Sequence, residues 1–154
     1  MFVRTIFLAV LSLFSIPNAV AYDAMKIKQF ISDEDALFQI TQWHGNDEAQ
    51  QWSADSRIKY LSVEIDPNQT KIGSPYFSPP LREAAKARCM AVARLALGVA
   101  TAEEKAALAS VMDKATQHHR RQSFDLNNVR FEAVPVLKGP FVTMYCLFMP
   151  IGET

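Results

Sequence analysis

Glycine and catalytic motifs are scarce in this sequence, and their absence removes several classes of function. The 154 residues include only five glycines, so the chain is poorly supplied with the glycine-rich loops that hold phosphates and cofactors. The sequence also lacks a G-x-S-x-G, H-E-x-x-H or C-x-x-C motif and an EF-hand loop. We therefore expect no cofactor, no metal site and no catalytic residue, and a protein that is not an enzyme.

The sequence has no excess of either charge. It contains 16 basic and 16 acidic side chains, whereas nucleic-acid-binding domains are usually strongly basic. We therefore expect no nucleic-acid partner. The charge is unevenly placed, because residues 22–66 carry nine acidic and four basic side chains while residues 67–154 carry seven acidic and eleven basic ones. Either the two halves pack together and neutralise each other, or the surface is dipolar and steers a charged partner.

Only one apolar run is prominent, and it lies at the N-terminus. Arg4 precedes an apolar stretch from Ile6 to Ile16, and Ala19-Val20-Ala21 provides the small residues of a cleavage site. The stretch is too short for a membrane span, which needs roughly 20 apolar residues. We expect residues 1–21 to be a cleaved signal peptide, with a retained anchor as the alternative. Residues 22–154 then form a single globular domain that is periplasmic or secreted, with no membrane span.

The sequence has only two cysteines, Cys89 and Cys146. In an exported protein this even number predicts a disulfide between them. The bridge would close a long loop and contribute about 4 kcal/mol to the free energy of unfolding. The alternative is two separate buried thiols, since free cysteine packs as a small apolar residue.

Two helices and a hairpin are predicted with clear boundaries. Ser78-Pro79-Pro80 begins one helix and Gly98 ends it, and the capping box Thr101–Glu104 begins the next. Residues 129–149 predict a C-terminal β-hairpin that turns at 138–140. Within it, 141–149 is apolar on both faces, as a central strand requires, and Pro135 suggests that the preceding strand ends early or lies at an edge. The predicted fold class is α+β, with an antiparallel helix pair packed on a small antiparallel sheet.

Three other segments are predicted from weaker patterns. Residues 31–45 favour a short helix, with Ser32 as its N-cap and Gly45 at its end. Residues 57–65 favour a strand, although a helix also fits their apolar spacing. Residues 66–80 contain four prolines and one glycine, which predicts a loop.

The stretch KATQHHRRQSFDLNN, residues 114–128, concentrates residues that metals and phosphates favour. Adjacent helical side chains point about 100° apart, so His118 and His119 cannot both reach one metal from a regular helix. We interpret the stretch as a helix C-terminus with His119 facing inward and Arg120 and Arg121 facing away. A patch that binds phosphate or acidic groups is the alternative.

Arg88 lies on the apolar stripe of the first predicted helix. Its head either reaches water, meets an acidic partner from residues 33–66, or lines a pocket with His119. In the proline-rich segment, Tyr76 and Phe77 either anchor a partner or fold back onto the core.

The sequence as a whole favours a small exported module that binds another protein, inhibitor-like or immunity-like, and neutralises or docks a partner in the cell envelope. The expected contacts are Tyr76 and Phe77 as anchors, with Arg120 and Arg121 as charged neighbours. One alternative is a periplasmic ligand binder or hydrolase with a pocket around Arg88 and His119. Another is a structural accessory component of an envelope machine.

Overall fold

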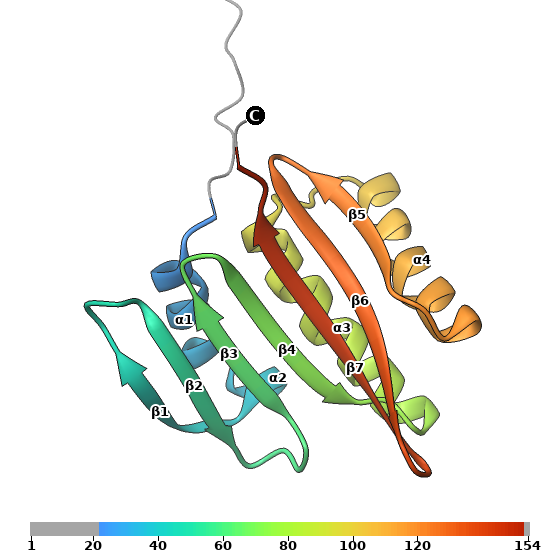
Figure 1. The fold of residues 1–154 in the computed structure, drawn as a ribbon, viewed down its shortest axis with the longest axis horizontal. Helices are drawn as coiled ribbons and strands as arrows, with labels where there is room; N and C mark the ends of the chain where they lie inside the picture. Colours follow the sequence, from blue (N-terminus) through green and yellow to red (C-terminus); the bar gives the residue numbers. More distant parts are fainter. Residues whose placement is uncertain (1–21, 153–154) are drawn as a thin grey trace, which may run out of the picture.

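The computed structural model describes residues 22–152, which form one seven-stranded antiparallel sheet with helices against it (Figure 1). The predicted signal peptide lies outside the described residues. The described helices are α1 (Ala24–Asp33), α2 (Asp35–Phe38), α3 (Pro79–Ala96) and α4 (Ala102–His118). The strands are β1 (Ile40–Asn46), β2 (Gln51–Ser56), β3 (Ser62–Asp66), β4 (Gln69–Pro75), β5 (Gln122–Leu126), β6 (Val129–Lys138) and β7 (Phe141–Pro150).

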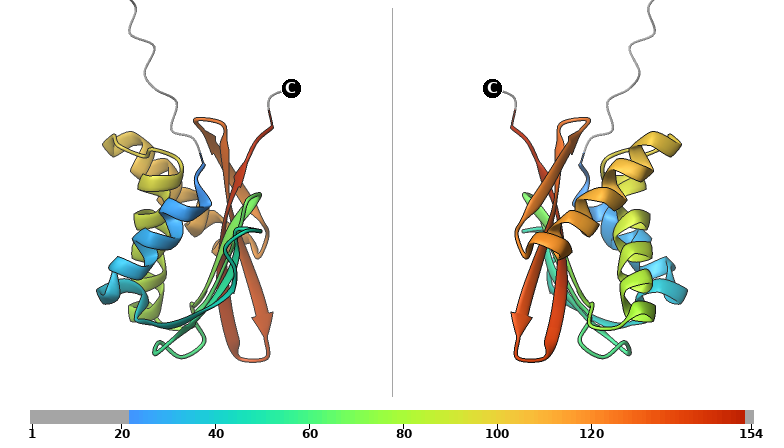
Figure 2. Two further views of the ribbon diagram at one scale, coloured as in Figure 1. Left: turned by 90° about the vertical axis from the view of Figure 1, so that its left-hand side faces the viewer. Right: turned by 90° about the vertical axis from the view of Figure 1, so that its right-hand side faces the viewer.

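The helices and the sheet form two layers. Figure 2 shows that the four described helices lie on one face of the sheet and leave the other face without a helix. We call this second face the open face. The α+β class is therefore confirmed, and the sheet is larger than the small sheet expected from the sequence. No helix in residues 22–152 is both long and apolar enough to cross a membrane.

The strand order, β1-β2-β3-β4-β7-β6-β5, joins two meanders at the centre of the sheet. The first meander runs from β1 to β4, the helix pair α3–α4 follows, and the second meander runs from β5 to β7. The two meet where β4 pairs with β7, in a register that places Ile72 opposite Cys146. The predicted C-terminal hairpin is confirmed as β6–β7, and β7 is a central strand as expected.

The disulfide fixes which side chains face the helices. Cys146 of β7 is bonded to Cys89 of α3, with their Cα atoms 6.0 Å apart, which confirms the predicted bridge. Because side chains alternate along a strand, Met144 and Phe148 also face the helices, and both are fully buried. Tyr145 and Leu147 accordingly lie on the open face.

Both long helices begin where the sequence predicts, and α3 also ends there. Ser78 is the N-cap of α3, with prolines at its first two positions, and the helix ends before Gly98, whose φ of 71° suits glycine. At the start of α4, Thr101 and Glu104 form both hydrogen bonds of the capping box. These local signals decide the boundaries because caps satisfy backbone groups that the helix leaves free.

Two predicted segments are wrong. Residues 31–45 do not form one helix, because α1 ends at Asp33, the short α2 follows, and Gln39 at φ 47° turns the chain into β1. Residues 66–80 are not a loop, because residues 69–75 form β4, one of the central strands. The helix-facing side of β4 includes two polar residues, Thr70 and Ser74. The strand therefore lacks the alternation of apolar and polar residues that would predict it from the sequence. Hydrogen bonds from β3 and β7, rather than intrinsic propensity, hold it in the sheet.

The segment 57–65 divides into a turn and a strand. β3 begins only at Ser62, so the predicted strand is confirmed in its second half. The preceding residues form a turn in which Tyr60 has a φ of 66°.

β6 does not end at Pro135, and instead continues to Lys138. However, β5 pairs with β6 only as far as Ala133. Pro135 therefore lies where β6 has no partner on that side, so its missing N–H leaves no ladder bond unmade.

Candidate functional site

Three aromatic side chains lie together and exposed at one end of the sheet. Tyr60, Phe77 and Phe141 are 58%, 39% and 49% exposed. The ring centroids of Phe77 and Phe141 are 5.3 Å apart, edge to face, and those of Tyr60 and Phe141 are 6.2 Å apart. We call these three residues the aromatic cluster. Exposed aromatics that touch one another are unusual on a soluble surface, so the cluster is our candidate functional site.

The cluster is assembled from three separate parts of the chain. Tyr60 comes from the β2–β3 turn, Phe77 from the link between β4 and α3, and Phe141 from the first position of β7. In Figure 1 these three connections all lie at the lower end of the molecule. The sheet topology, which places the β2–β3 and β6–β7 turns at the same end, therefore creates the site.

The buried neighbour of Phe77 holds that ring in place. Tyr76 is only 2% exposed, its backbone N–H donates to the Val142 carbonyl at 2.8 Å, and its own carbonyl accepts from Arg82 Nε at 3.3 Å. Tyr76 is therefore not the exposed anchor expected from the sequence. It packs in the interior and fixes the backbone from which Phe77 projects outward.

A hollow of about 490 Å³ opens beside the cluster on the open face. All three rings of the cluster line it, together with Tyr145 and Lys138. We call it the first hollow. Its volume lies within the range of sites that accept a small molecule or a protruding side chain.

Gly73 makes room for the ring of Tyr145, which lines the first hollow. Gly73 of β4 lies opposite Tyr145 of β7, and a Cβ atom at position 73 would lie 2.6 Å from the Tyr145 ring and would also collide with Ser62 Oγ. The absence of a side chain therefore lets the Tyr145 ring lie against β4. Lys71 of the same strand also contacts that ring, with its Nζ 5.1 Å from the ring centroid.

A second hollow, of about 190 Å³, adjoins the first. It lies between the C-terminus of α4 and the β6–β7 hairpin, and Phe77 and Val142 line both hollows. Arg82 and His119 also line the second hollow. Phe77 is therefore exposed between two depressions, one on each side of the hairpin.

His119 does not face the interior as expected. It is the C-cap of α4, with a φ of 49°, and its side chain is exposed. The helical projection fails at this residue because the chain leaves the helix there and turns into the left-handed conformation. The same turn brings His119 to the second hollow, near Phe77.

The two predicted arginine contacts are exposed, as the sequence suggests. Arg121 Nε lies 3.2 Å from Glu132 Oε2 on the open face of β6, so part of its charge is neutralised within the protein. Arg120 has no carboxylate within ion-pair distance in residues 22–152.

Arg88 is buried and does not line the second hollow, where His119 lies. Its Nε donates to the Leu37 carbonyl at 2.6 Å, which gives a backbone carbonyl near the end of α2 a hydrogen-bond donor. The partner thus comes from the expected region, but it is a carbonyl rather than a carboxylate. The Nη1 atom has no hydrogen-bond partner within the described chain, and burial lowers the pKa of Arg88. Among the described hollows, the one that His119 lines does not include Arg88.

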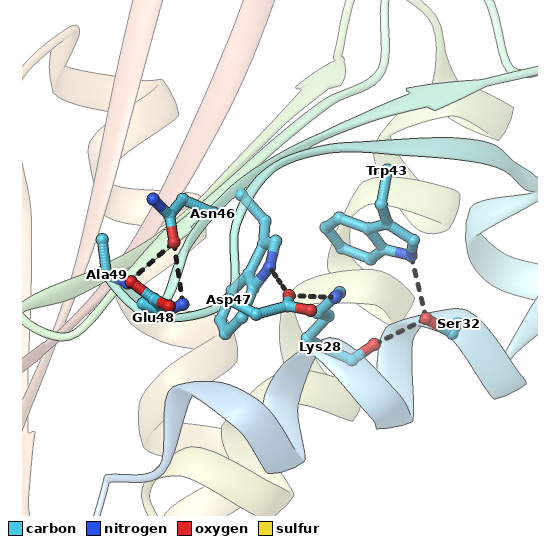
Figure 3. A network of polar contacts seen from close by, with 8 residues as sticks. Lys28, Ser32, Trp43, Asn46, Asp47, Glu48 and Ala49 are labelled. Carbon is cyan, nitrogen blue, oxygen red and sulfur yellow. Dashed lines mark hydrogen bonds and ion pairs between the residues drawn. The ribbon is translucent and has the colours of Figure 1, made fainter.

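A second aromatic cluster, around Lys28, joins α1 to the β1–β2 hairpin (Figure 3). Lys28 Nζ lies 4.5 Å from the centroid of the Trp52 ring and 5.8 Å from that of Trp43. Asp47 accepts a hydrogen bond from Trp52 Nε1 at 2.7 Å, and this bond, followed by the charge of Lys28, lowers the pKa of Asp47. Because its members bind one another, we assign this cluster to the fold rather than to a binding site.

The sequence offers little by which Tyr60 and Phe141 could be recognised as site residues. Each is a single aromatic in or beside a turn, and only the register of the strands brings them together with Phe77. Within residues 22–152, no three potential metal ligands are grouped. No protein-family model matches the sequence, and neither curated proteins nor solved structures show a significant similarity to it.

Proposed function

We propose that this protein is a small exported module that binds another protein, docking on it or neutralising it in the cell envelope, as an inhibitor or immunity protein does. The observation that carries the proposal is the aromatic cluster, in which three rings from three chain segments meet and remain exposed. Each exposed ring leaves apolar area in water that a partner would bury.

The composition of the site supports a protein partner. Aromatic side chains near the centre of an interface provide much of its binding energy, because they bury a large area and lose little rotamer entropy. The two adjoining hollows make the surface uneven, and protruding side chains of a partner protein can fill them. A flat lipid surface cannot fill these hollows.

The test compares capture of a partner by the wild type and by a variant without the cluster. The tagged protein is incubated with the envelope fraction of its own organism, and bound proteins are measured by quantitative mass spectrometry. We expect one stoichiometric partner with the wild type, and at least a roughly thirtyfold weaker affinity for it with Tyr60→Ala/Phe141→Ala, since interface hot spots are worth about 2 kcal/mol or more.

The matched control is Met25→Ala, which removes another large exposed apolar side chain, 45% exposed, from α1. This variant should capture the partner as well as the wild type does. Melting temperatures of all variants should stay close to the wild type, because the substituted side chains are exposed. Equal capture by the cluster variant would contradict the proposal, and recovery of only the protein itself would favour a structural component that self-associates.

A further inference from the structure

The two hollows around Phe77 carry basic side chains and no acidic ones. Lys138 lines the first hollow, and Arg82 and His119 line the second. Lys59 is the next residue to Tyr60, and its Nζ lies 4.9 Å from the Tyr60 ring centroid. No Asp or Glu appears in the lining of either hollow. The aromatic cluster is therefore flanked by positive charge on both sides.

Three of the cations around the cluster form no ion pair with a carboxylate of the described chain. Lys59, Arg82 and Lys138 have no carboxylate oxygen within ion-pair distance in the part of the chain that the structure describes. The neighbouring groove between α3 and α4 shows the opposite arrangement, because its Lys86 lies 2.7 Å from Asp113. Unpaired positive charge around the cluster makes the site complementary to negative groups on a partner.

The adjacent strand edge shows how a partner segment would bind. β6 extends past Gln122, the first residue of β5, so the last residues of β6 form a free edge beside the second hollow. Pro135 lies on this edge and lacks the N–H that an added strand would need. Recognition therefore depends on side chains that enter the hollows, not on backbone pairing along the edge.

From this geometry we infer that the partner presents an acidic surface loop, and this inference rests on the proposed function. An apolar side chain of the loop enters the first hollow between Tyr60 and Phe141. Carboxylates on either side of it bind Lys138 in the first hollow and Arg82 in the second. The aromatic cluster provides affinity, and the cations select an acidic sequence and reject a basic one.

The experiment selects peptides from a phage-displayed random library on the purified protein, and then measures synthetic versions by fluorescence anisotropy. We expect the selected peptides to be enriched in Asp and Glu around an apolar residue. Lys138→Glu/Arg82→Glu should weaken their binding at least about tenfold, because like charges would then face each other, and Phe141→Ala should abolish it. The matched control, Arg94→Glu, reverses a charge on α3 about 18 Å along the helix axis from Arg82, and should leave binding unchanged.

The outcomes separate the two proposals. Peptides that need Phe141 but show no acidic enrichment, and that bind the double charge-reversal variant normally, would overturn the acidic partner and leave the proposed function standing. Peptides that bind Phe141→Ala as well as the wild type would overturn both. Binding to phosphatidylglycerol vesicles that depends on Phe141, with no such peptide, would also overturn both and would assign the cluster to a membrane surface.

Discussion

Arg88 is the residue whose burial is hardest to account for. Its charge is removed from water without a carboxylate to balance it, and one of its nitrogens has no partner within the described chain. Its hydrogen bond to the Leu37 carbonyl stabilises the short α2. A buried charge of this kind costs more than an apolar side chain of the same volume.

Replacing Arg88 by Met should therefore change the free energy of unfolding by no more than about 1 kcal/mol. The cost of burying the charge is removed, and this gain offsets the loss of the hydrogen bond. Arg88→Ala should destabilise by roughly 2–4 kcal/mol, since it also leaves a cavity. Urea denaturation of the two variants beside the wild type measures both values. A loss above about 3 kcal/mol in Arg88→Met would show that the guanidinium has a stronger partner.

Tyr22 makes a contribution to stability that is lost at high pH. Its hydroxyl donates to the Asp66 carbonyl at 2.9 Å and lies 2.9 Å from Thr70 Oγ1. Burial is the main reason why the pKa of Tyr22 is raised from 10.0 to about 12. The neutral hydroxyl is thus favoured in the folded state. Its contribution is fully present below pH 10 and is lost as the pH rises from 10 to about 12.

Tyr22→Phe should accordingly be less stable than the wild type at pH 8 by about 1 kcal/mol, the usual value of such hydrogen bonds. The difference should shrink as the pH approaches 12, because only the wild type then loses stability through this group. Chemical denaturation at several pH values checks this, with Tyr60→Phe, at an exposed ring, expected to follow the wild type. A difference that stays constant up to high pH would contradict the assignment.

At the scale of elements, the β1–β2 hairpin depends on α1. β1 lies at the edge of the sheet, pairs only with β2, and is mostly exposed. The cluster around Lys28 links the hairpin to α1, and Ser32 of α1 also accepts a hydrogen bond from Trp43 Nε1 at 2.9 Å. The hairpin is therefore the part of the sheet that we expect to open first.

Lys28→Ala should speed amide hydrogen exchange in β1 and β2 roughly five- to thirtyfold, which corresponds to a local loss of about 1–2 kcal/mol. Exchange in β4 and β7 should stay at the wild-type rate, because these strands lie at the centre of the sheet. Lys26→Ala is the control, since Lys26 lies on the same helix and forms only an exposed ion pair with Asp23. Faster exchange across the whole sheet would show that the cluster supports the global fold instead.

Elements with local signals were predictable, and elements held by their neighbours were not. The capping box of α4 and the prolines of α3 mark their helices because caps act within a few residues. The four prolines and one glycine of residues 66–80 predict a loop, whereas the structure places Pro67 in a turn before β4 and Pro75 at the last position of the strand. Gly73 is required by the Tyr145 ring across the sheet, a contact between residues far apart in the chain.

At the scale of the whole molecule, the disulfide connects the two layers and the two halves of the chain. Cys89 and Cys146 are both fully buried, and the bridge joins α3 to the central strand β7 across 57 residues. Closing so long a loop restricts the unfolded chain much more than the folded one.

Cys89→Ala/Cys146→Ala should therefore lower the free energy of unfolding by about 4 kcal/mol. Urea denaturation of this variant beside the wild type gives the value. Reduction of the wild type with dithiothreitol should produce a similar loss, which separates the effect of the bond from that of the two substitutions. A loss below about 1 kcal/mol would show that the packing between α3 and β7 suffices alone.

The candidate site as a whole shows what the sequence leaves open. Phe77 was identified from its proline-rich surroundings, and the structure exposes it. Its neighbour Tyr76 has the same composition around it but is buried, so composition alone does not separate the two residues. Tyr60 and Phe141 join the cluster only through strand register, which a single sequence does not specify.

The aromatic cluster and the two ends of the described chain lie at opposite ends of the molecule (Figure 1). β7 alone, from Phe141 to Pro150, separates them by about 30 Å. A tether attached at Tyr22 or after Gly152, whether a sensor surface, a fusion partner or a membrane anchor, would therefore hold the protein with its aromatic end pointing away from the support. The molecule is suited to attachment at the end that holds its termini and to contact through the end that holds the aromatic cluster.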